Sequence, residues 1–184
     1  MTDVEGRPLL TALESLIWDV PDYPSPGILF KDITPLLADH DTFTATVQAL
    51  ADAGRDGSGA TVVDKVLGME ARGFILAAPV ALALGAGFVP VRKAGKLPRE
   101  THAVSYALEY GEATLEIHTD AVAPGERVLL VDDVLATGGT IDATRQLVEA
   151  CGGTVAGVAV LMELSALPGR AAVGALPLTA LMTV

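Results

Sequence analysis

Two adjacent carboxylates, Asp132 and Asp133, stand just before a loop whose residue types are suited to holding an anion. The loop consists of five small or hydroxylated residues, Ala136, Thr137, Gly138, Gly139 and Thr140. Its paired glycines permit backbone conformations closed to other residues, and apolar residues at helical spacing follow from Ile141 to Ala150. We therefore expect the loop to open a helix. Free amide hydrogens at a helix start, with threonine hydroxyls nearby, favour the binding of a phosphate.

The acid pair needs a role of its own, because carboxylates beside a phosphate repel it unless they face hydroxyl groups or a metal carried by the same ligand. A ribose 5-phosphate meets this demand, with its phosphate in the loop and its ring hydroxyls donating to Asp132 and Asp133. Two other interpretations remain open. One is a tight strand-to-helix turn in which Thr140 caps the helix and the acids are solvated. The other is a receiver-type domain in which one of the aspartates accepts a phosphoryl group.

Three short apolar runs are the elements that must position these residues: Val62–Leu67, Phe88–Val91 and Val128–Val131. Each run is typical of a strand buried on both faces, as in a parallel sheet. Open sheets of this kind bind their ligands at the carboxyl ends of the strands, where Asp132 and Asp133 should project. The pattern predicts an α/β fold with a parallel sheet flanked by helices.

Basic residues gather after the run that ends at Val91, as Arg92, Lys93, Lys96 and Arg99. The chain carries a net charge of -11, so this concentration indicates a local site for an anion. Arg72 should stand at a helix amino terminus, where a cation is disfavoured unless it meets an anion such as diphosphate. Two alternatives are a solvated basic face for the cluster and, for Arg72, a surface pair with Glu70.

The amino-terminal part combines an amphipathic helix from Leu9 to about Trp18 with a proline-rich stretch over Val20–Leu37. Four prolines predict an extended, irregular path in that stretch that is neither helix nor central strand. Because the stretch is too apolar for disorder, we expect it to fold as a hood. Phe30 could stack on a flat heterocycle or simply pack in the core. Asp41 is expected to cap the next helix.

Alternating side chains from Ala103 to Ile117 predict a two-stranded flap that turns at Gly111. The basic loop before it contains Gly95 and Pro98, so the segment of about residues 93–112 is expected to be flexible. A loop of this kind can close over a reacting ligand and keep water out.

Composition limits the possible partners and location. The chain has 184 residues, 51% of them hydrophobic, which suits one compact domain, and its acidic balance argues against a nucleic-acid or membrane-surface partner. Its one cysteine, Cys151, excludes an internal disulfide, and the first residues lack the pattern of a secretory signal, so a cytoplasmic location is expected. The uncharged stretch Phe74–Val91 is interrupted by prolines and glycines and is expected to be core rather than a membrane span.

Several segments resemble the adenine phosphoribosyltransferase family in order and spacing: PSPGILFKDITPLL, EARGF, VPVRKAGKLPRE, YALEYG, LEIH and DDVLATGGT. The resemblance covers nearly all the chain from about Trp18 onward. It implies the type I phosphoribosyltransferase fold in a single domain, residues 1–184, with a hood contributed by about residues 19–37 and the carboxyl-terminal part. It also implies a homodimer and the Mg²⁺-dependent formation of AMP and diphosphate from adenine and phosphoribosyl pyrophosphate (PRPP), in purine salvage.

The same resemblance implies roles for individual residues. Loop residues 136–140 match the 5-phosphate loop, and Asp132 and Asp133 match the ribose acids, with Mg²⁺ carried by PRPP and at most water-bridged to these two acids. The matching diphosphate contacts are Arg72, Lys93 and Lys96, with Arg92 as nearby support. The matching adenine contacts are Leu29, Phe30, Lys31 and Leu164. Glu109 matches an acid proposed to assist at the base, beside Arg72 as a catalytic residue, and Tyr110 neighbours Glu109 in the closed loop. In relatives, the peptide bond before the residue matching Ala71 is a non-proline cis bond.

The choice of base follows from one position. Relatives that act on 6-oxopurines commonly carry an aspartate where this loop has Ala136, so the resemblance favours adenine. Adenine can be read by a backbone carbonyl and amide at Leu29. The alternatives are a phosphoribosyltransferase for another purine base and a non-catalytic regulator that senses PRPP and binds nucleic acid. The second would call for a basic face outside the cleft, whereas the visible bases converge on it.

Overall fold

The computed structural model describes residues 8–107 and 111–184, and the chain divides into two compact units, residues 1–49 and 50–184. The first unit contains α1 (Leu9–Leu16), β1 (Trp18–Pro21), β2 (Leu29–Asp32) and α2 (Thr34–Ala38), and α3 (His40–Ala51) crosses the boundary. The hood segment predicted for about residues 19–37 falls within this unit. The organisation of the whole chain as one domain stays a prediction.

The proline-rich stretch is more regular than the sequence suggested. β1 and β2 form an antiparallel pair in which Val20 faces Phe30, and α2 follows with a proline in its first turn. Prolines are compatible with this arrangement because they stand at a strand end, in the connection, or where a helix has no amide bond to lose. The expected cap is also wrong by two residues, because Asp39 Oδ1 accepts the Thr42 amide at 2.9 Å at the start of α3, in the place assigned to Asp41.

The second unit contains the remaining elements. They are the 3-10 turn Asp52–Gly54, β3 (Lys65–Met69), α4 (Arg72–Leu84), β4 (Gly87–Lys93), β5 (Thr101–Ala107), β6 (Glu112–His118), β7 (Arg127–Leu135), α5 (Gly139–Ala150), β8 (Thr154–Glu163), α6 (Gly169–Val173) and β9 (Leu178–Thr183).

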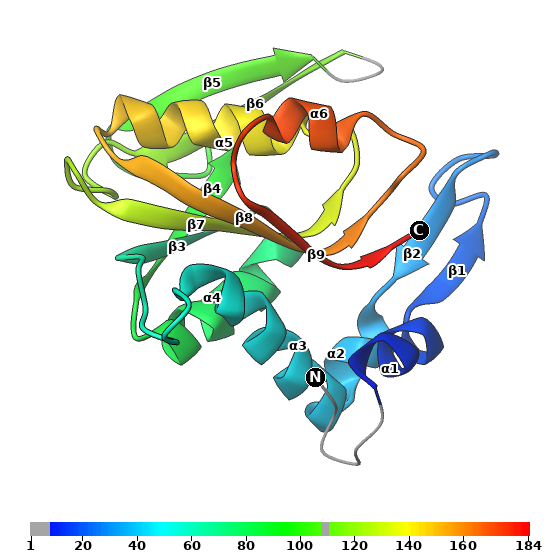
Figure 1. Cartoon of the computed structure of the whole chain (residues 1–184). Helices are drawn as coiled ribbons and strands as arrows, with labels where there is room; N and C mark the ends of the chain where they lie inside the picture. The colour runs from blue at the N-terminus through cyan, green and yellow to red at the C-terminus, as the bar shows by residue number, and fades with distance from the viewer. Residues whose placement is uncertain (1–7, 108–110) are drawn as a thin grey trace. The chain divides into compact units, whose positions relative to one another are not determined.

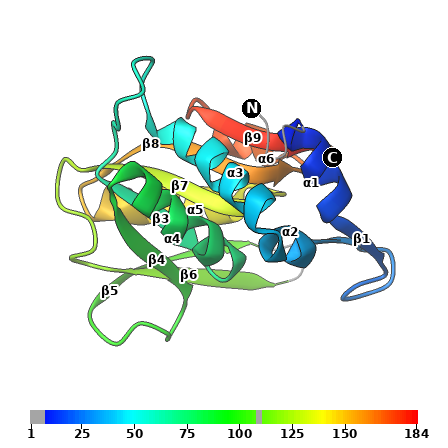
Figure 2. The same ribbon diagram turned by 90° about the horizontal axis from the view of Figure 1, so that it is seen from below.

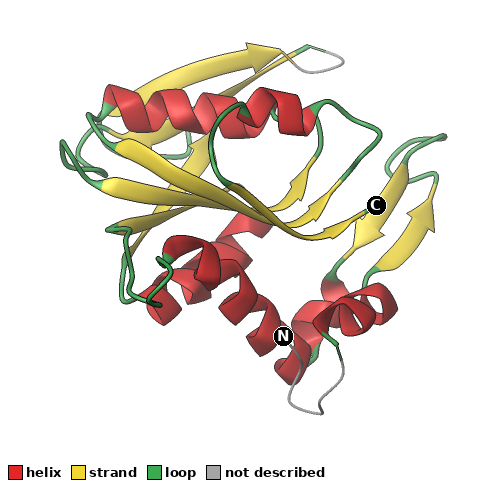
Figure 3. Cartoon of the chain, in the orientation of Figure 1, coloured by secondary structure: helices red, strands yellow, loops and turns green. Residues whose placement is uncertain are grey.

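Among the described residues, seven strands of this unit form one sheet in the order β5-β6-β4-β3-β7-β8-β9 (Figure 1, Figure 3). The five strands from β4 to β9 run parallel to their neighbours, which confirms the parallel sheet. β5 and β6 form the expected antiparallel flap, and β6 continues the sheet by pairing with the last residues of β4. The flap is therefore anchored directly at Arg92 and Lys93, the two basic residues that end β4.

Helices cover both faces of this sheet, with α4 packed on β3 and β7 on one face and α5 on the other (Figure 1, Figure 2). α4 buries Leu76, Val80 and Leu84, and α5 buries Ile141 and Leu147, so each helix offers an apolar stripe to the strands. The uncharged stretch Phe74–Val91 lies in α4 and β4, but only part of it is core as expected, because Ile75, Leu82 and Phe88 are exposed. Within the ranges that the structure describes, no helix combines the length and apolar character needed to cross a bilayer.

β7 is longer than the apolar run predicted. Its pairing with β3 ends at Val131, but its pairing with β8 continues through Asp132 and Val134 to Leu135. Asp132 and Asp133 are thus still in strand conformation, although the pairing with the neighbouring β3 has already ended. β3 itself begins at Lys65, later than expected, and ends next to the acid pair.

Candidate active site

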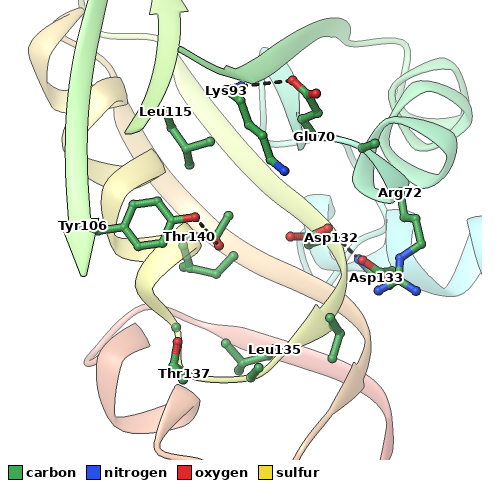
Figure 4. A pocket seen from close by; sticks show the side chains of 15 residues that line it. Glu70, Arg72, Lys93, Tyr106, Leu115, Asp132, Asp133, Leu135, Thr137 and Thr140 are labelled. Atoms are coloured by element: carbon green, nitrogen blue, oxygen red, sulfur yellow. Dashed lines mark hydrogen bonds and ion pairs between the residues drawn. The ribbon is translucent and has the colours of Figure 1, made fainter. Parts of the chain in front are cut away.

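A cleft of about 380 Å³ opens where β3, β4 and β7 end (Figure 4). It is lined by Glu70, Ala71, Arg72, Lys93, Tyr106, Leu115, Asp132, Asp133, Val134, Leu135, Ala136, Thr137, Gly138, Thr140 and Ile141. Three strand ends that are distant in sequence therefore bring together eight of the residues singled out above. The eight are Arg72, Lys93, Asp132, Asp133, Ala136, Thr137, Gly138 and Thr140.

The phosphate loop, residues 136–140, leads directly into α5. The helix begins at Gly139, and Gly138 is its N-cap with φ +83°, a left-handed conformation that favours glycine. The alternative in which Thr140 caps the helix is therefore wrong, because Thr140 already belongs to the first helical turn. First-turn amides have no acceptor within their own helix. Thr137 and Thr140 line the cleft beside these amides, so the groups that an anion site requires are present, and the binding of an anion there stays a prediction.

The acid pair is held between α4 and the phosphate loop. Asp133 is buried, and its Oδ2 lies 2.7 Å from Nη2 of Arg72, the first residue of α4. Within the described part of the chain, that oxygen accepts no hydrogen bond of good geometry, so the contact is an ion pair. Asp132 Oδ1 accepts the Asp133 amide at 2.9 Å. The pairing proposed between Arg72 and Glu70 as an alternative is thus replaced by a pairing with Asp133.

The ionised form of Asp132 is disfavoured by its surroundings. Burial of its carboxyl group against the sheet, and then the negative charge of Asp133, raise its pKa well above the ordinary value. Part of the side chain still reaches the cleft, so its surface is not fully enclosed. A hydroxyl donor or a cation arriving there would stabilise the ionised form.

Glu70, which the sequence reasoning did not select, organises the basic cluster. Its carboxylate accepts a hydrogen bond from Lys96 Nζ at 2.8 Å, from the Lys93 amide at 3.0 Å and from Arg92 Nε at 3.3 Å. The Lys96 hydrogen bond is the main reason why its pKa falls to about 2. Lys93 points into the cavity (Figure 4). Arg92 and Lys96 do not line the cavity and pair with Glu70 instead.

Tyr106 is a second residue that the reasoning missed. It comes from β5, and its hydroxyl lies 3.2 Å from Thr140 Oγ1 (Figure 4). A Cβ atom on Gly139 would lie 2.8 Å from the Tyr106 ring, so the glycine leaves room for the aromatic side chain. In the sequence, Tyr106 is one member of an alternating strand pattern, and nothing in that pattern distinguishes it from its neighbours.

Other selected residues lie elsewhere. Leu164 follows β8 in the second unit and does not line this cleft, and Leu29, Phe30 and Lys31 belong to β2 of the first unit. The Phe30 ring packs edge-on against Tyr23, and Lys31 pairs with Asp19. Glu109 and Tyr110 lie outside the described residues. The peptide bond between Glu70 and Ala71 is cis, as the resemblance implied.

No group of three or more His, Cys, Asp or Glu side chains suited to a metal occurs within residues 8–107 and 111–184. The pair Asp132 and Asp133 nevertheless fits Mg²⁺, because carboxylate oxygens are its preferred protein ligands and Mg²⁺ commonly binds through one or two of them with substrate phosphates and water. The raised pKa of Asp132 points the same way, since a cation would relieve the repulsion between the two acids.

The chain is similar in sequence and in fold to known proteins. Residues 37–171 match the model of the phosphoribosyl transferase domain. The adenine phosphoribosyltransferase of Nocardioides sp. is 72% identical over 177 residues, which cover 96% of each chain. The crystal structure of the enzyme of that name from Thermoanaerobacter pseudethanolicus is 47% identical with a TM-score of 0.89, over 95% of this chain and 99% of that one. The Saccharomyces cerevisiae enzyme, solved with an imino-altritol bisphosphate and adenine, is 37% identical with a TM-score of 0.88, over 94% and 98%.

Proposed function

The chain belongs to the adenine phosphoribosyltransferases of the phosphoribosyltransferase family, and from this premise we propose how it carries out the reaction. It is a pentosyltransferase that moves the ribose 5-phosphate of PRPP to adenine, giving AMP and diphosphate in purine salvage. The observation that carries this function is a single cleft in which a helix-opening phosphate loop, an acid pair and fixed cations meet. An activated sugar phosphate presents a group for each of them.

The reaction builds positive charge on the ribose ring and negative charge on the departing diphosphate. Arg72 and Lys93 line the cleft and supply fixed cations toward the leaving group, with Lys96 and Arg92 close behind them. Asp132 and Asp133 accept hydrogen bonds from the ring hydroxyls. Mg²⁺ bound together with PRPP would neutralise further charge on the diphosphate, held through water by the acid pair.

For the base, we propose that adenine is bound by Leu29, Phe30 and Leu164, with Lys31 in support. Support comes from the family resemblance and from the apolar side chain of Leu164 in the segment after β8. Glu109 would assist proton transfer at the base, an effect worth about a hundred- to ten-thousandfold in rate. Tyr110 would close the flap beside it, so that water is kept from the reacting carbon.

We further propose that the protein is a cytoplasmic homodimer. Its one cysteine, a buried free thiol, suits a reducing compartment. Support for a dimer comes from apolar side chains on the outer surface of the second unit, where Ile75, Leu82 and Phe88 are 45%, 83% and 37% exposed. Light scattering should give twice the chain mass for the wild type, and Leu82→Lys should shift it toward the monomer. A wild-type monomer would contradict the dimer.

The base preference and the metal requirement are tested together. Adenine, hypoxanthine, guanine and xanthine are each offered with PRPP and Mg²⁺, and nucleotide and diphosphate are measured. We expect product with adenine alone and its loss when Mg²⁺ is removed by a chelator. Comparable turnover of a 6-oxopurine would favour the alternative, a phosphoribosyltransferase for another base.

A further inference from the structure

Glu163 and Arg170 form a bidentate ion pair outside the cleft. Arg170 Nε donates to Glu163 Oε1 at 2.8 Å, and Nη2 of the same side chain donates to Oε2. Glu163 is the last residue of β8 and is only 7% exposed, whereas Arg170 lies in α6 with its side chain 63% exposed. Paired bonds of this kind fix orientation as well as distance. The hydrogen bonds from Arg170 also hold the pKa of Glu163 below its ordinary value, so the carboxylate is ionised in the neutral pH range.

The pair fastens α6 against the back of the phosphate loop. Gly169, next to Arg170, is buried, and a Cβ atom on it would lie less than 3.0 Å from the carbonyl oxygen of Ala136. A Cβ atom on Gly138 would lie equally close to the side chain of Ala172. Figure 1 shows α6 beside the start of α5. The loop that holds the phosphate is therefore packed tightly on α6, and a shift of α6 must be felt in the loop.

The segment between the two charged residues contains Leu164. Its amide donates to the carbonyl oxygen of Leu135 at 3.0 Å, in the strand that leads into the phosphate loop. The Leu167 amide in turn donates to the Leu164 carbonyl oxygen at 3.0 Å, which closes a turn before α6. The ion pair thus joins the two ends of residues 163–170. This segment contacts the phosphate loop through Gly169 and includes the apolar side chain of Leu164.

We propose that the Glu163–Arg170 ion pair acts as a clamp that sets the positions of the phosphate loop and of Leu164 together. Arg170 is then a positioning residue for both substrates, although it does not line the cleft. The assignment of the two substrates rests on the proposed function. The clamp itself rests on the contacts of α6 with residues 136–138. A displaced loop loses hydrogen bonds to the phosphate, because these depend steeply on distance and angle.

Two variants test the clamp from different sides. Arg170→Gln removes the ion pair, and Gly169→Ala keeps it but pushes a methyl group against Ala136. Arg55→Gln, which breaks a pair with Asp52 away from the cleft, and Gly57→Ala, where a Cβ meets no neighbour, are the matched controls. Circular dichroism and melting temperature establish that each protein is folded.

Binding of ribose 5-phosphate is measured by calorimetry, and KM for both substrates is measured in the AMP-forming reaction. We expect Arg170→Gln and Gly169→Ala each to weaken ribose 5-phosphate binding and to raise both KM values about tenfold, with a smaller change in kcat. The double variant should lose less than the product of the two effects, because both act on one contact. The controls should stay within about twofold of the wild type.

Folded Gly169→Ala or Arg170→Gln protein with wild-type affinity for ribose 5-phosphate would overturn the clamp. If Arg170→Gln does not fold, Glu163→Gln, which removes the same ion pair from its other side, takes its place with the same expected losses. Wild-type protein that binds ribose 5-phosphate but forms no AMP would overturn the proposed function, while the binding losses of the two variants would still support the clamp.

Discussion

The hydroxyl of Tyr106 lies 3.2 Å from Oγ1 of Thr140, so a strand of the flap is joined directly to the first turn of α5. The Tyr106 ring also fills the space that a side chain at Gly139 would need. The flap, which is expected to close the cleft, and the phosphate loop, which is expected to bind the phosphate, are therefore in direct contact. Thr140 can be oriented toward a phosphate by a residue that the flap brings with it.

We expect Tyr106→Phe to raise KM for PRPP about two- to tenfold, the usual cost of one hydrogen bond, with kcat less affected. Tyr106→Ala should cost more, since it also removes the ring beside Gly139. Steady-state kinetics with adenine saturating measures both. Ser105→Ala is the matched control, because Ser105 pairs with Thr114 on the exposed face of the same strand. An unchanged KM in Tyr106→Ala would remove Tyr106 from the site.

Gly138 has a left-handed backbone conformation and also lies close to Ala172. The effect of a side chain on backbone strain can therefore be separated from its effect on this contact. Gly138→Ala should destabilise the fold by about 1–2 kcal/mol for its φ of +83° and also weaken ribose 5-phosphate binding, because its methyl group meets Ala172. Gly125→Ala is the control, since Gly125 has φ +85° with no neighbour within 4 Å. Urea denaturation and calorimetry measure the two quantities. Equal loss of affinity in both variants would contradict the role of the contact with Ala172.

The parallel sheet and the phosphate loop could be predicted because their signals are local. Buried strands appear as apolar runs, and the loop combines small and hydroxylated residues before a helical pattern. Since parallel strands end at one edge, Arg72, Lys93 and Asp132 could be assigned to a common site without knowledge of the strand order. The resemblance to a known family added the identity of the ligand.

The parts that escaped prediction depend on contacts distant in sequence. Glu70 accepts hydrogen bonds from the basic cluster because β3 pairs with β4 so that Met69 lies opposite Val91. No local sequence pattern reveals this register. Tyr106 matters because β5 packs on α5, and the two are far apart along the chain. In the first unit, prolines suggested an irregular path, but the pairing of Val20 with Phe30 produced a regular two-stranded ribbon.

Glu70 should contribute stability that depends on pH. Because its pKa is lowered to about 2, its ionised form is favoured in the folded protein, and the contribution is present above the ordinary value of 4.5 and lost as pH falls toward 2. We expect Glu70→Gln to lower the free energy of unfolding by about 1 kcal/mol at pH 7, a modest value because Lys96 is half exposed.

Urea denaturation between pH 7 and pH 3 measures this dependence. The difference between wild type and Glu70→Gln should shrink as the pH falls. Glu149→Gln, which removes an exposed partner of Arg145 on α5, should change stability little at any pH. A difference for Glu70→Gln that does not vary with pH would mean that packing, and not its charge, is responsible.

Asp132 should show the opposite dependence of stability on pH, because its ionised carboxylate is disfavoured in the folded protein. Burial and the charge of Asp133 raise the pKa of Asp132, so its ionisation costs stability as pH rises above the ordinary value of 3.8. Asp132→Asn should therefore raise the melting temperature at pH 7, and the gain should shrink at acidic pH. The asparagine oxygen can still accept the Asp133 amide, so the local backbone contact is kept.

The same substitution should weaken PRPP binding about ten- to a hundredfold, because a neutral amide accepts the ring hydroxyls less strongly than a carboxylate and attracts no cation. Asp120→Asn is the contrasting control. Arg99 lowers the pKa of the exposed Asp120, so removal of the Asp120 charge should not stabilise the protein. A melting temperature that falls in Asp132→Asn would show that the charge is stabilising. The repulsion between the two acids would then not be what a bound hydroxyl or cation relieves.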